Sequence, residues 1–370
     1  MIDPMSNSKR INNSMRPSPE TVIRPEIMAL QSYHVADATG MVKLDAMENP
    51  YRLPQAVLDQ LSAVTITAEI NRYPDPQALA LKAMLRQSLQ IPDQLEILLG
   101  NGSDEIIQML IMAVAKPGAV VLGVEPAFVM FKMISVLCGA RFVGVPLDTE
   151  FNLDLDVMLA VIEKESPQLI FIAYPNNPTG NLFDSERIER VIAAAPGLVV
   201  IDEAYQAFAE KTFMDRLLQY PNVVLMRTLS KSGLAGLRLG VLVGARAWIS
   251  AIDKLRLPYN INVLTQLTAA KVLAHESLLA EQAALLRAER TQLYLALQTI
   301  AGVVVYQSAA NFLLFRIADA TTVFNRFKDR GVLIKDLNGS HKALVNCLRV
   351  TVGKPEENAQ FIAALRASIY

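Results

Sequence analysis

The lysine at position 231 has unusual neighbours in the sequence. It lies in TLSKSGLAGLRLG (residues 228–240), among small and apolar residues, with no carboxylate within six positions on either side. An ammonium that leaves water without a partner is costly, so a lysine in such a place tends to lose its proton. The neutral amine is a nucleophile, which makes Lys231 a candidate for covalent chemistry. The alternative is that Lys231 is exposed to solvent, the commonest position for a lysine.

Three other polar stretches each follow an apolar run that predicts a strand. LGNGSDE (residues 99–105) leads into an expected helix, YPNNPTG (174–180) follows a run ending at Ala173, and VIDEAY (200–205) places Asp202 at the end of another. In open α/β sheets, ligands bind beyond the carboxyl ends of the strands, where these stretches and the Lys231 loop would meet. The two glycines and the helix start in LGNGSDE offer free backbone N–H groups to an anion.

Each stretch also has an explanation without chemistry. Gly-x-Gly and Asn-Asn-Pro-Thr-Gly are common turn sequences, and an Asp at a strand end is often a helix cap. A nicotinamide-nucleotide site is a further alternative, because Gly100, Gly102 and Glu125 imitate its fingerprint. The third glycine of that fingerprint would fall at Glu105, whose carboxylate disfavours a pyrophosphate, and no Gly-Lys-Ser/Thr of a P-loop occurs. The four stretches together are far more specific than any one of them.

Short, continuously apolar runs recur through the first two thirds of the chain, as is typical of strands buried on both faces of a sheet. Amphipathic stretches capped by Ser103, Asp154 and Asp184 predict helices between most of them. This alternation indicates a mostly parallel, seven-stranded α/β sheet. The runs that start at Val223 and Leu239 lack a full helix between them, which allows one antiparallel strand there. The expected strands are 97–99, 120–124, 142–145, 169–173, 198–201, 223–226 and 239–243.

Beyond about Ala247 the pattern changes to long helices and then to a smaller α+β unit. The expected helices are 247–254, 263–301, 321–330 and one from Pro355, with strands at 303–306, 311–316, 332–335 and 347–352. We therefore expect a disordered tail (1–20), an extended N-terminal arm (21–50), a large domain (51–260) and a small C-terminal domain (261–370).

Composition excludes several classes of protein. The 35 basic and 36 acidic residues give a net charge of −1, which offers no electrostatic footprint for nucleic acid. No apolar run approaches the roughly 18 residues that a membrane span needs. Cys138 and Cys347 give neither a disulfide framework nor a zinc spacing, so no metal is expected. The first 20 residues lack a hydrophobic signal core, and a cytoplasmic location is expected.

YPNNPTG, DEAY and SKSGLAGLRLG, in that order, resemble the pyridoxal-phosphate aminotransferases of fold type I, from about Arg24 to the C-terminus. VKLDAMENPY, NRYPDPQ, SAANFLLFR and CLRVTVGKPEEN resemble the histidinol-phosphate aminotransferases within that family. The resemblance implies a large domain with a mostly parallel seven-stranded sheet, a smaller α+β domain, pyridoxal 5'-phosphate as the cofactor and a homodimer. It also implies amino transfer between a phosphorylated amine, L-histidinol phosphate, and 2-oxoglutarate/glutamate in histidine biosynthesis.

The same resemblance implies roles for individual residues. The catalytic residues would be Lys231, which forms an imine with the cofactor, Asp202, which accepts the pyridinium N–H, and Tyr205, which binds the phenolic oxygen together with Asn177. An apolar pocket and a nearby Arg238 would both favour the neutral amine of Lys231. The other implied cofactor contacts are Gly102, Ser103, Asp104, Ser230 and Arg238 on the phosphate, Phe128 on the ring and Tyr73 from a neighbouring subunit. Plain core packing is the alternative for Phe128 and Tyr73.

For the substrates, the resemblance implies Arg349 as the anion anchor, with Tyr33 and Lys335 as helpers and Asn49 near the reacting end. The alternative for Arg349 is a surface arginine at a strand start. Lys335 departs from the family, where an arginine is more usual.

Two further departures lie in AMENPYR, where Met47 replaces an amide and Arg52 a glycine. Threonine-phosphate decarboxylation and aromatic or general amino-acid transamination therefore remain alternatives. A cofactor-binding regulator without chemistry is another, although the short polar start leaves no room for the DNA-binding helices that such regulators usually carry.

Overall fold

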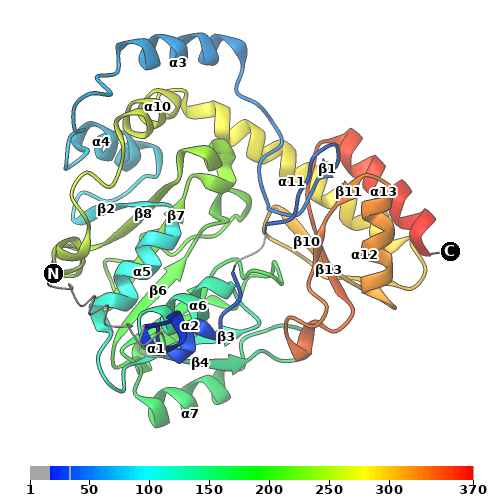
Figure 1. Ribbon diagram of the computed structural model, residues 1–370, viewed down its shortest axis with the longest axis horizontal. Helices are drawn as coiled ribbons and strands as arrows, with labels where there is room; N and C mark the ends of the chain where they lie inside the picture. The colour runs from blue at the N-terminus through cyan, green and yellow to red at the C-terminus, as the bar shows by residue number, and fades with distance from the viewer. Residues whose placement is uncertain (1–16, 33–34, 370) are drawn as a thin grey trace, which may run out of the picture. The chain divides into compact units, whose positions relative to one another are not determined.

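The computed structural model describes residues 17–32 and 35–369 (Figure 1). Met1–Ala36 and Asp37–Tyr370 form separate compact units. The first contains two one-turn helices, α1 (Pro19–Val22) and α2 (Pro25–Met28), each starting at a proline whose fixed φ suits that position. The range 21–50, expected to be extended, therefore contains α2 and the end of α1.

A seven-stranded sheet is the main element of the second unit. Its strand order is β2-β8-β7-β6-β5-β3-β4. Strand β8 runs antiparallel to both of its neighbours, whereas all other pairs are parallel. The predictions of a mostly parallel sheet and of one antiparallel strand are confirmed. The strands are β2 (Leu95–Asn101), β3 (Val120–Glu125), β4 (Arg141–Pro146), β5 (Leu169–Ala173), β6 (Leu198–Asp202), β7 (Val223–Thr228) and β8 (Leu239–Ala245).

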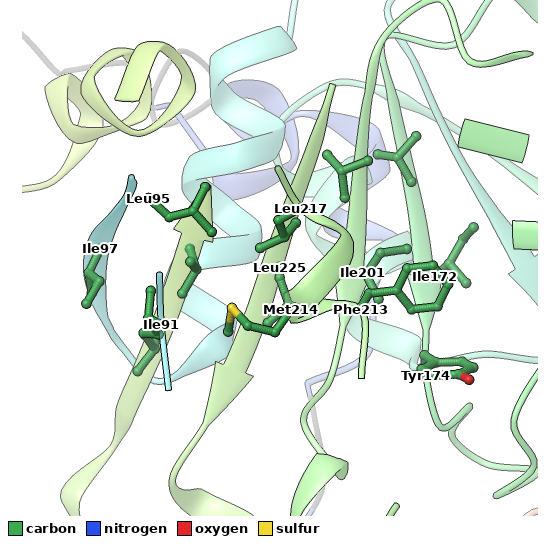
Figure 2. Packing of buried hydrophobic residues seen from close by; sticks show 14 of the residues in the cluster. Ile91, Leu95, Ile97, Ile172, Tyr174, Ile201, Phe213, Met214, Leu217 and Leu225 are labelled. Carbon is green, nitrogen blue, oxygen red and sulfur yellow. The ribbon is translucent and has the colours of Figure 1, made fainter. Parts of the chain in front are cut away.

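Successive strand residues pack in two different cores, which explains the continuously apolar runs. On β5, Ile170 and Ile172 belong to one buried cluster, while Leu169, Phe171 and Ala173 belong to another. Figure 2 shows part of the first cluster, where side chains of β5, β6 and β7 pack with residues of the β6–β7 connection. The first core also takes residues of α4 (Leu79–Ser88), α7 (Leu155–Glu165), α8 (Ser185–Ala194) and α10 (Val263–Leu273), and the second takes those of α5 (Ser103–Val114), α6 (Val129–Leu137) and α9 (Arg246–Ile252).

The single helix expected over 263–301 is wrong, because α10 ends at Leu273 and α11 (Glu276–Gln298) begins after a break at His275. The buried residues of α10 belong to the first core of the large sheet. Those of α11, such as Leu286 and Leu297, belong to a third cluster built on the C-terminal strands. Leu278 and Leu279, at the start of α11, still pack against the first core, so the change of core occurs within α11 after the break. The domain boundary at residue 260 stays a prediction.

The C-terminal strands form a four-stranded sheet in the order β12-β13-β10-β9. The single strand expected over 332–335 is wrong, because β11 (Val332–Leu333) leaves this sheet and pairs with β1 (Val42–Lys43). The remaining elements are α3 (Gln55–Thr67), β9 (Val303–Val305), β10 (Phe312–Ile317), α12 (Ala320–Asp329), β12 (Lys335–Asp336), β13 (Cys347–Thr351) and α13 (Pro355–Ile369). Within residues 17–32 and 35–369, no helix is long and apolar enough to cross a membrane.

Candidate active site

Lys231 lies in a short π-helical turn (Ser230–Leu234) that follows β7. The turn needs glycine at position 233, where φ is +115° and a Cβ would lie 3.0 Å from Nδ2 of Asn49. The Nζ atom of Lys231 donates a hydrogen bond to the carbonyl of Ala46 at 3.1 Å. Burial, followed by the nearby guanidinium of Arg349, lowers the pKa of Lys231 to about 8. The neighbouring cation expected from the sequence, Arg238, has a smaller influence than Arg349.

Asp202 ends β6 at the level of Ala173 on β5 and Met226 on β7, at the carboxyl edge of the sheet. Its carboxylate is buried and accepts the N–H of Ala204 at 3.0 Å. Burial raises the pKa of this carboxyl group to about 7. The helical turn that follows begins only at Gln206, with Tyr205 in the capping position, so Asp202 is not its cap.

Two side chains next to this carboxylate form a hydrogen-bonded pair that extends toward the C-terminal sheet. Asn177 donates from Nδ2 to the hydroxyl of Tyr205 at 3.2 Å, and both residues are buried. The Oδ1 atom of Asn177 accepts a 2.5 Å hydrogen bond from Nη1 of Arg349. Residues from β13 and from the edge of the large sheet are therefore in direct contact.

The start of α5 provides the anion-binding features that the sequence predicts. Gly102 has a φ of +81°, and a Cβ there would lie 2.6 Å from Nη2 of Arg238. Arg238 pairs with Asp104 at 3.2 Å and donates to Oγ of Ser230 at 3.4 Å. This region thus brings together the free N–H groups of a helix start, a guanidinium and hydroxyl groups. Such a set of donors can bind an anion such as a phosphate.

A cavity of about 100 Å³ lies at the sheet edge, and Gly102 and Arg349 are not among its lining residues. Nine of the sequence-predicted residues line it: Ser103, Asp104, Phe128, Asn177, Asp202, Tyr205, Ser230, Lys231 and Arg238. Four lining residues were not predicted as site residues: Met47, Ala173, Ala204 and Thr228. Ala173 and Thr228 end their strands, so their position at the sheet edge could have identified them. Met47 was singled out only as a departure from the family.

Phe128 is a wall of this cavity and not merely a core residue. It precedes α6 and meets Phe131 edge-on, with ring centroids 5.6 Å apart. Phe131 is the ring that packs in the core, stacked on Phe171 at 4.5 Å. One face of Phe128 can therefore contact a flat ligand.

Arg349 is buried, with 7% of its surface exposed, so it is not a surface arginine. Its Nη2 donates to the carbonyl of Asp45 at 3.1 Å, and its guanidinium lies over the ring of Phe312 at 5.2 Å. Lys335 of β12 is the direct antiparallel partner of Arg349, which places both side chains on one face of the small sheet. Two cations are thus neighbours beside the cavity.

Neither Asn49 nor Tyr73 lines the cavity. Asn49 donates to Oε1 of Gln282 at 2.9 Å and lines a larger cavity of about 720 Å³, which shares Ser230 with the first. Tyr73 is 80% exposed and stacks on Tyr259 with centroids 4.3 Å apart, so packing in a core does not explain it. Tyr33 lies outside the described residues.

A buried ion pair joins the ends of β6 and β7 next to the site. It was not predicted from the sequence. Arg227 donates from Nη2 to Oε2 of Glu203 at 2.8 Å and to the hydroxyl of Thr212 at 2.9 Å. Glu203 follows Asp202 directly, and Arg227 precedes the Lys231 loop. The ion pair therefore holds the end of β6, which carries Asp202, beside the end of β7, which leads into the Lys231 loop. Among the described residues, no group of three or more His, Cys, Asp or Glu could hold a metal ion.

A partly buried amine, a buried carboxylate and an anion cradle at the edge of a mixed seven-stranded sheet define a class of enzyme. The chain matches the family described as "Aminotransferase class I and II" over residues 39–365, and it belongs to this family. It is 51% identical over 355 residues to histidinol-phosphate aminotransferase 2 of Cupriavidus pinatubonensis, covering 95% of this chain and 97% of that protein. It is 53% identical to histidinol-phosphate aminotransferase 2 of Nitrosococcus oceani over 351 residues, covering 93% and 96%.

A solved structure shows the same fold. Histidinol-phosphate aminotransferase from Sinorhizobium meliloti, in complex with pyridoxal-5'-phosphate, superposes with a TM-score of 0.84 at 25% identity, covering 94% of this chain and 98% of that one. The fold class expected from the sequence motifs and the resemblance to these enzymes are confirmed.

Proposed function

We propose that this protein is a pyridoxal-phosphate-dependent aminotransferase that moves an amino group between L-histidinol phosphate and 2-oxoglutarate in histidine biosynthesis. The observation that carries the proposal is the single cavity that brings together Lys231, Asp202 and the Arg238 anion cradle. The names of relatives at about 50% identity support the choice of substrates.

The residues present fit the cofactor. The cradle at Gly102, where a side chain would meet Arg238, would hold the phosphate, and Phe128 would stack on the ring. Asp202 would hold the proton of the ring nitrogen, because a cationic partner favours the ionised form of a buried carboxylate. The bound cofactor supplies an electron sink for the carbon that bears the amino group. The amine of Lys231, with its pKa near 8, would carry protons to and from that carbon.

Substrate recognition would rest on the two neighbouring cations of the small sheet. Histidinol phosphate has an alcohol carbon where an amino acid has its α-carboxylate, so its phosphate is its only anion. The planar fork of Arg349 can pair with either a phosphate or a carboxylate, which allows one side chain to bind both substrates in turn. Lys335, a flexible point charge, would add attraction for the doubly charged phosphate.

Spectroscopy of the purified holoenzyme tests this function. Histidinol phosphate should abolish the visible absorbance of the lysine-bound cofactor, and 2-oxoglutarate should restore it. Absorbance that does not respond to histidinol phosphate would reject the substrate. Release of carbon dioxide from threonine phosphate would favour the decarboxylase alternative, for which a solved L-threonine-O-3-phosphate decarboxylase at 20% identity offers likeness of fold.

We also propose a homodimer in which Tyr73 serves the cofactor of the partner. Tyr73 is exposed and stacks on Tyr259, and α10 packs against both α3 and α4. The exposed large apolar side chains of these helices and of the segments that precede α4 and α10 are Ile66, Ile70, Tyr73, Leu79, Leu257, Tyr259, Leu264 and Leu267. Monomeric proteins seldom expose such surfaces, and a second copy would bury this one. A cytoplasmic location is expected from the proposed biosynthetic role, and cell fractionation tests it.

Subunit mixing tests the shared site. Lys231→Ala protein, which is inactive, is mixed with impaired Tyr73→Phe protein under conditions where subunits exchange. Some heterodimers then carry one site free of both changes, and activity should rise above that of either parent. A mixture that exchanges subunits without any gain would contradict the shared site.

A further inference from the structure

Three consecutive residues, Asp45, Ala46 and Met47, form a segment that we call the strap. The carbonyl of Asp45 accepts a hydrogen bond from Nη2 of Arg349, and the carbonyl of Ala46 accepts one from Nζ of Lys231, both at 3.1 Å. Met47 is next in the chain and lines the cofactor cavity. Adjacent main-chain oxygens therefore contact both the amine and the substrate-anchoring guanidinium of the proposed reaction.

Met47 has a backbone conformation that its surroundings must maintain. Its φ of +54° lies in the left-handed region, which is uncommon for residues other than glycine, asparagine and aspartate. Such conformations persist only where neighbouring groups hold them. Here the N–H of Met47 donates to Oγ1 of Thr351 at 2.9 Å, and its carbonyl accepts from Nδ2 of Asn311 at 3.0 Å.

The two side chains that hold Met47 are well placed to act as clamps. Thr351 is 2% exposed and Asn311 is 1% exposed, so water does not compete for these hydrogen bonds. Thr351 ends β13, the strand that carries Arg349, and its own N–H donates to the carbonyl of Leu44 at 2.8 Å. These hydrogen bonds thus hold the strap on β13, the strand that also carries the proposed anion anchor, Arg349.

We propose that Thr351 and Asn311 are positioning residues for amino transfer, acting through the strap on Lys231 and Arg349 together. This inference rests on the roles given above to Lys231 and Arg349. The strap keeps the amine aimed into the cavity whenever it is not joined to cofactor, and it holds the guanidinium at a fixed distance from that amine. Misplacement of a reacting group by about 1 Å can cost up to about 100-fold in rate.

The test compares Thr351→Val, which keeps the shape but loses the hydroxyl, with Thr351→Ser, which keeps the hydroxyl. In the holoenzyme, normalised to bound cofactor, Thr351→Val should lower kcat about tenfold and raise KM for both substrates several-fold. Thr351→Ser should stay close to wild type. A purely structural role would lower cofactor content or thermal stability while leaving both normalised constants unchanged, and that result would overturn the proposal.

A second measurement uses cofactor-free protein and does not depend on activity. Labelling by acetic anhydride at pH 9 is followed by peptide mass spectrometry, with the exposed Lys164 as internal reference. The label on Lys231 should form several-fold faster in Thr351→Val than in wild type or Thr351→Ser, because its amine is no longer held by Ala46. Buried Cys347, on the same strand, should stay unreactive toward thiol reagents.

Equal labelling of Lys231 in all three proteins would overturn the proposal, as would Cys347 becoming reactive together with Lys231, because the whole strand would then have loosened. If Thr351→Val does not fold, Asn311→Ala removes the other side chain that holds Met47. The normalised kinetic constants and the labelling of Lys231 in that variant then test the proposal. A wild-type protein without amino-transfer activity would reject the proposed function, while the labelling comparison would still test the strap.

Discussion

The cofactor end of the site and its anion end are built in different ways. The cofactor end consists of side chains at or just beyond the ends of neighbouring strands of one sheet, such as Asp202, which ends β6, and Lys231, which lies in the turn after β7. The anion end joins Arg349 of the small sheet to Asn177, in the loop after β5 of the large sheet, and to the main chain of Asp45. The first is positioned by a regular sheet, whereas the second depends on contacts between segments far apart in the chain. We therefore expect substitutions at the cofactor end to affect the chemistry, and those at the anion end to affect substrate choice as well.

The largest effect should come from Lys231→Ala. The variant should lose all turnover and the visible absorbance of the bound cofactor, because within residues 17–32 and 35–369 no other amine lines the cavity. Circular dichroism should show an unchanged fold. Borohydride reduction of wild type followed by peptide mapping should place the cofactor on the peptide with Lys231, and label on another lysine would contradict the assignment.

Arg349→Ala should weaken both half-reactions, by about 100-fold or more in kcat/KM, since a buried charge that makes hydrogen bonds is lost. Single-turnover kinetics with glutamate and with histidinol phosphate measures each half separately. The matched variant Lys335→Ala should cost about tenfold, mainly with the phosphate-bearing substrate. A glutamate half-reaction that Arg349→Ala leaves untouched would require a second anion site.

Asp202→Asn should retain cofactor and lose activity by about one to two decades, because a neutral amide cannot stabilise a ring cation. A carboxylate–cation hydrogen bond in a buried site is worth on the order of 1.5–3 kcal/mol. Unlike Arg349→Ala, this change should lower kcat with little effect on KM for either substrate. Unchanged turnover would show that Asp202 serves only the local turn at Ala204.

The smallest effect concerns the pH dependence of stability in cofactor-free protein. The pKa of Asp202 is raised from 3.8 to about 7 by burial, with smaller contributions from Asp104 and Glu203. The folded state therefore holds a proton that the unfolded chain releases, and the stability contributed by Asp202 is complete below pH 4 and lost as the pH rises to 7. Urea unfolding should show wild type losing about 2 kcal/mol relative to Asp202→Asn between pH 5 and pH 7. Parallel pH profiles for the two proteins would contradict the raised pKa.

The sequence predicted the cofactor end better than the anion end, and the reason is physical. Polar residues after continuously apolar runs identify the edge of a parallel sheet, so Asp202 and Lys231 could be found from pattern alone. The acceptors for Lys231 and Arg349 are main-chain carbonyls at Ala46 and Asp45, which any residue type supplies. No sequence pattern marks them.

The fold, like the site, could be predicted where the local sequence determines it but not where long-range packing does. Six parallel strands and the antiparallel β8 could be predicted because local patterning and connection lengths determine them. The break between α10 and α11 could not, because Ala274, His275 and Glu276 include neither glycine nor proline. The buried apolar residues of α10 and those of α11 beyond Leu279 belong to different clusters, a long-range feature that no local pattern marks.

The contacts of Arg349 also bear on when the protein becomes active during its synthesis. Its partners Asn177 and Asp45 lie 172 and 304 positions earlier in the chain. Chains emerge from the ribosome N-terminus first, and contacts of large sequence separation form late because loop closure must precede them. The seven strands of the large sheet can be complete while β13 is still being made. A nascent chain can therefore complete the large sheet, with Asp202 and Lys231 at its edge, before it has the proposed anchor for substrate.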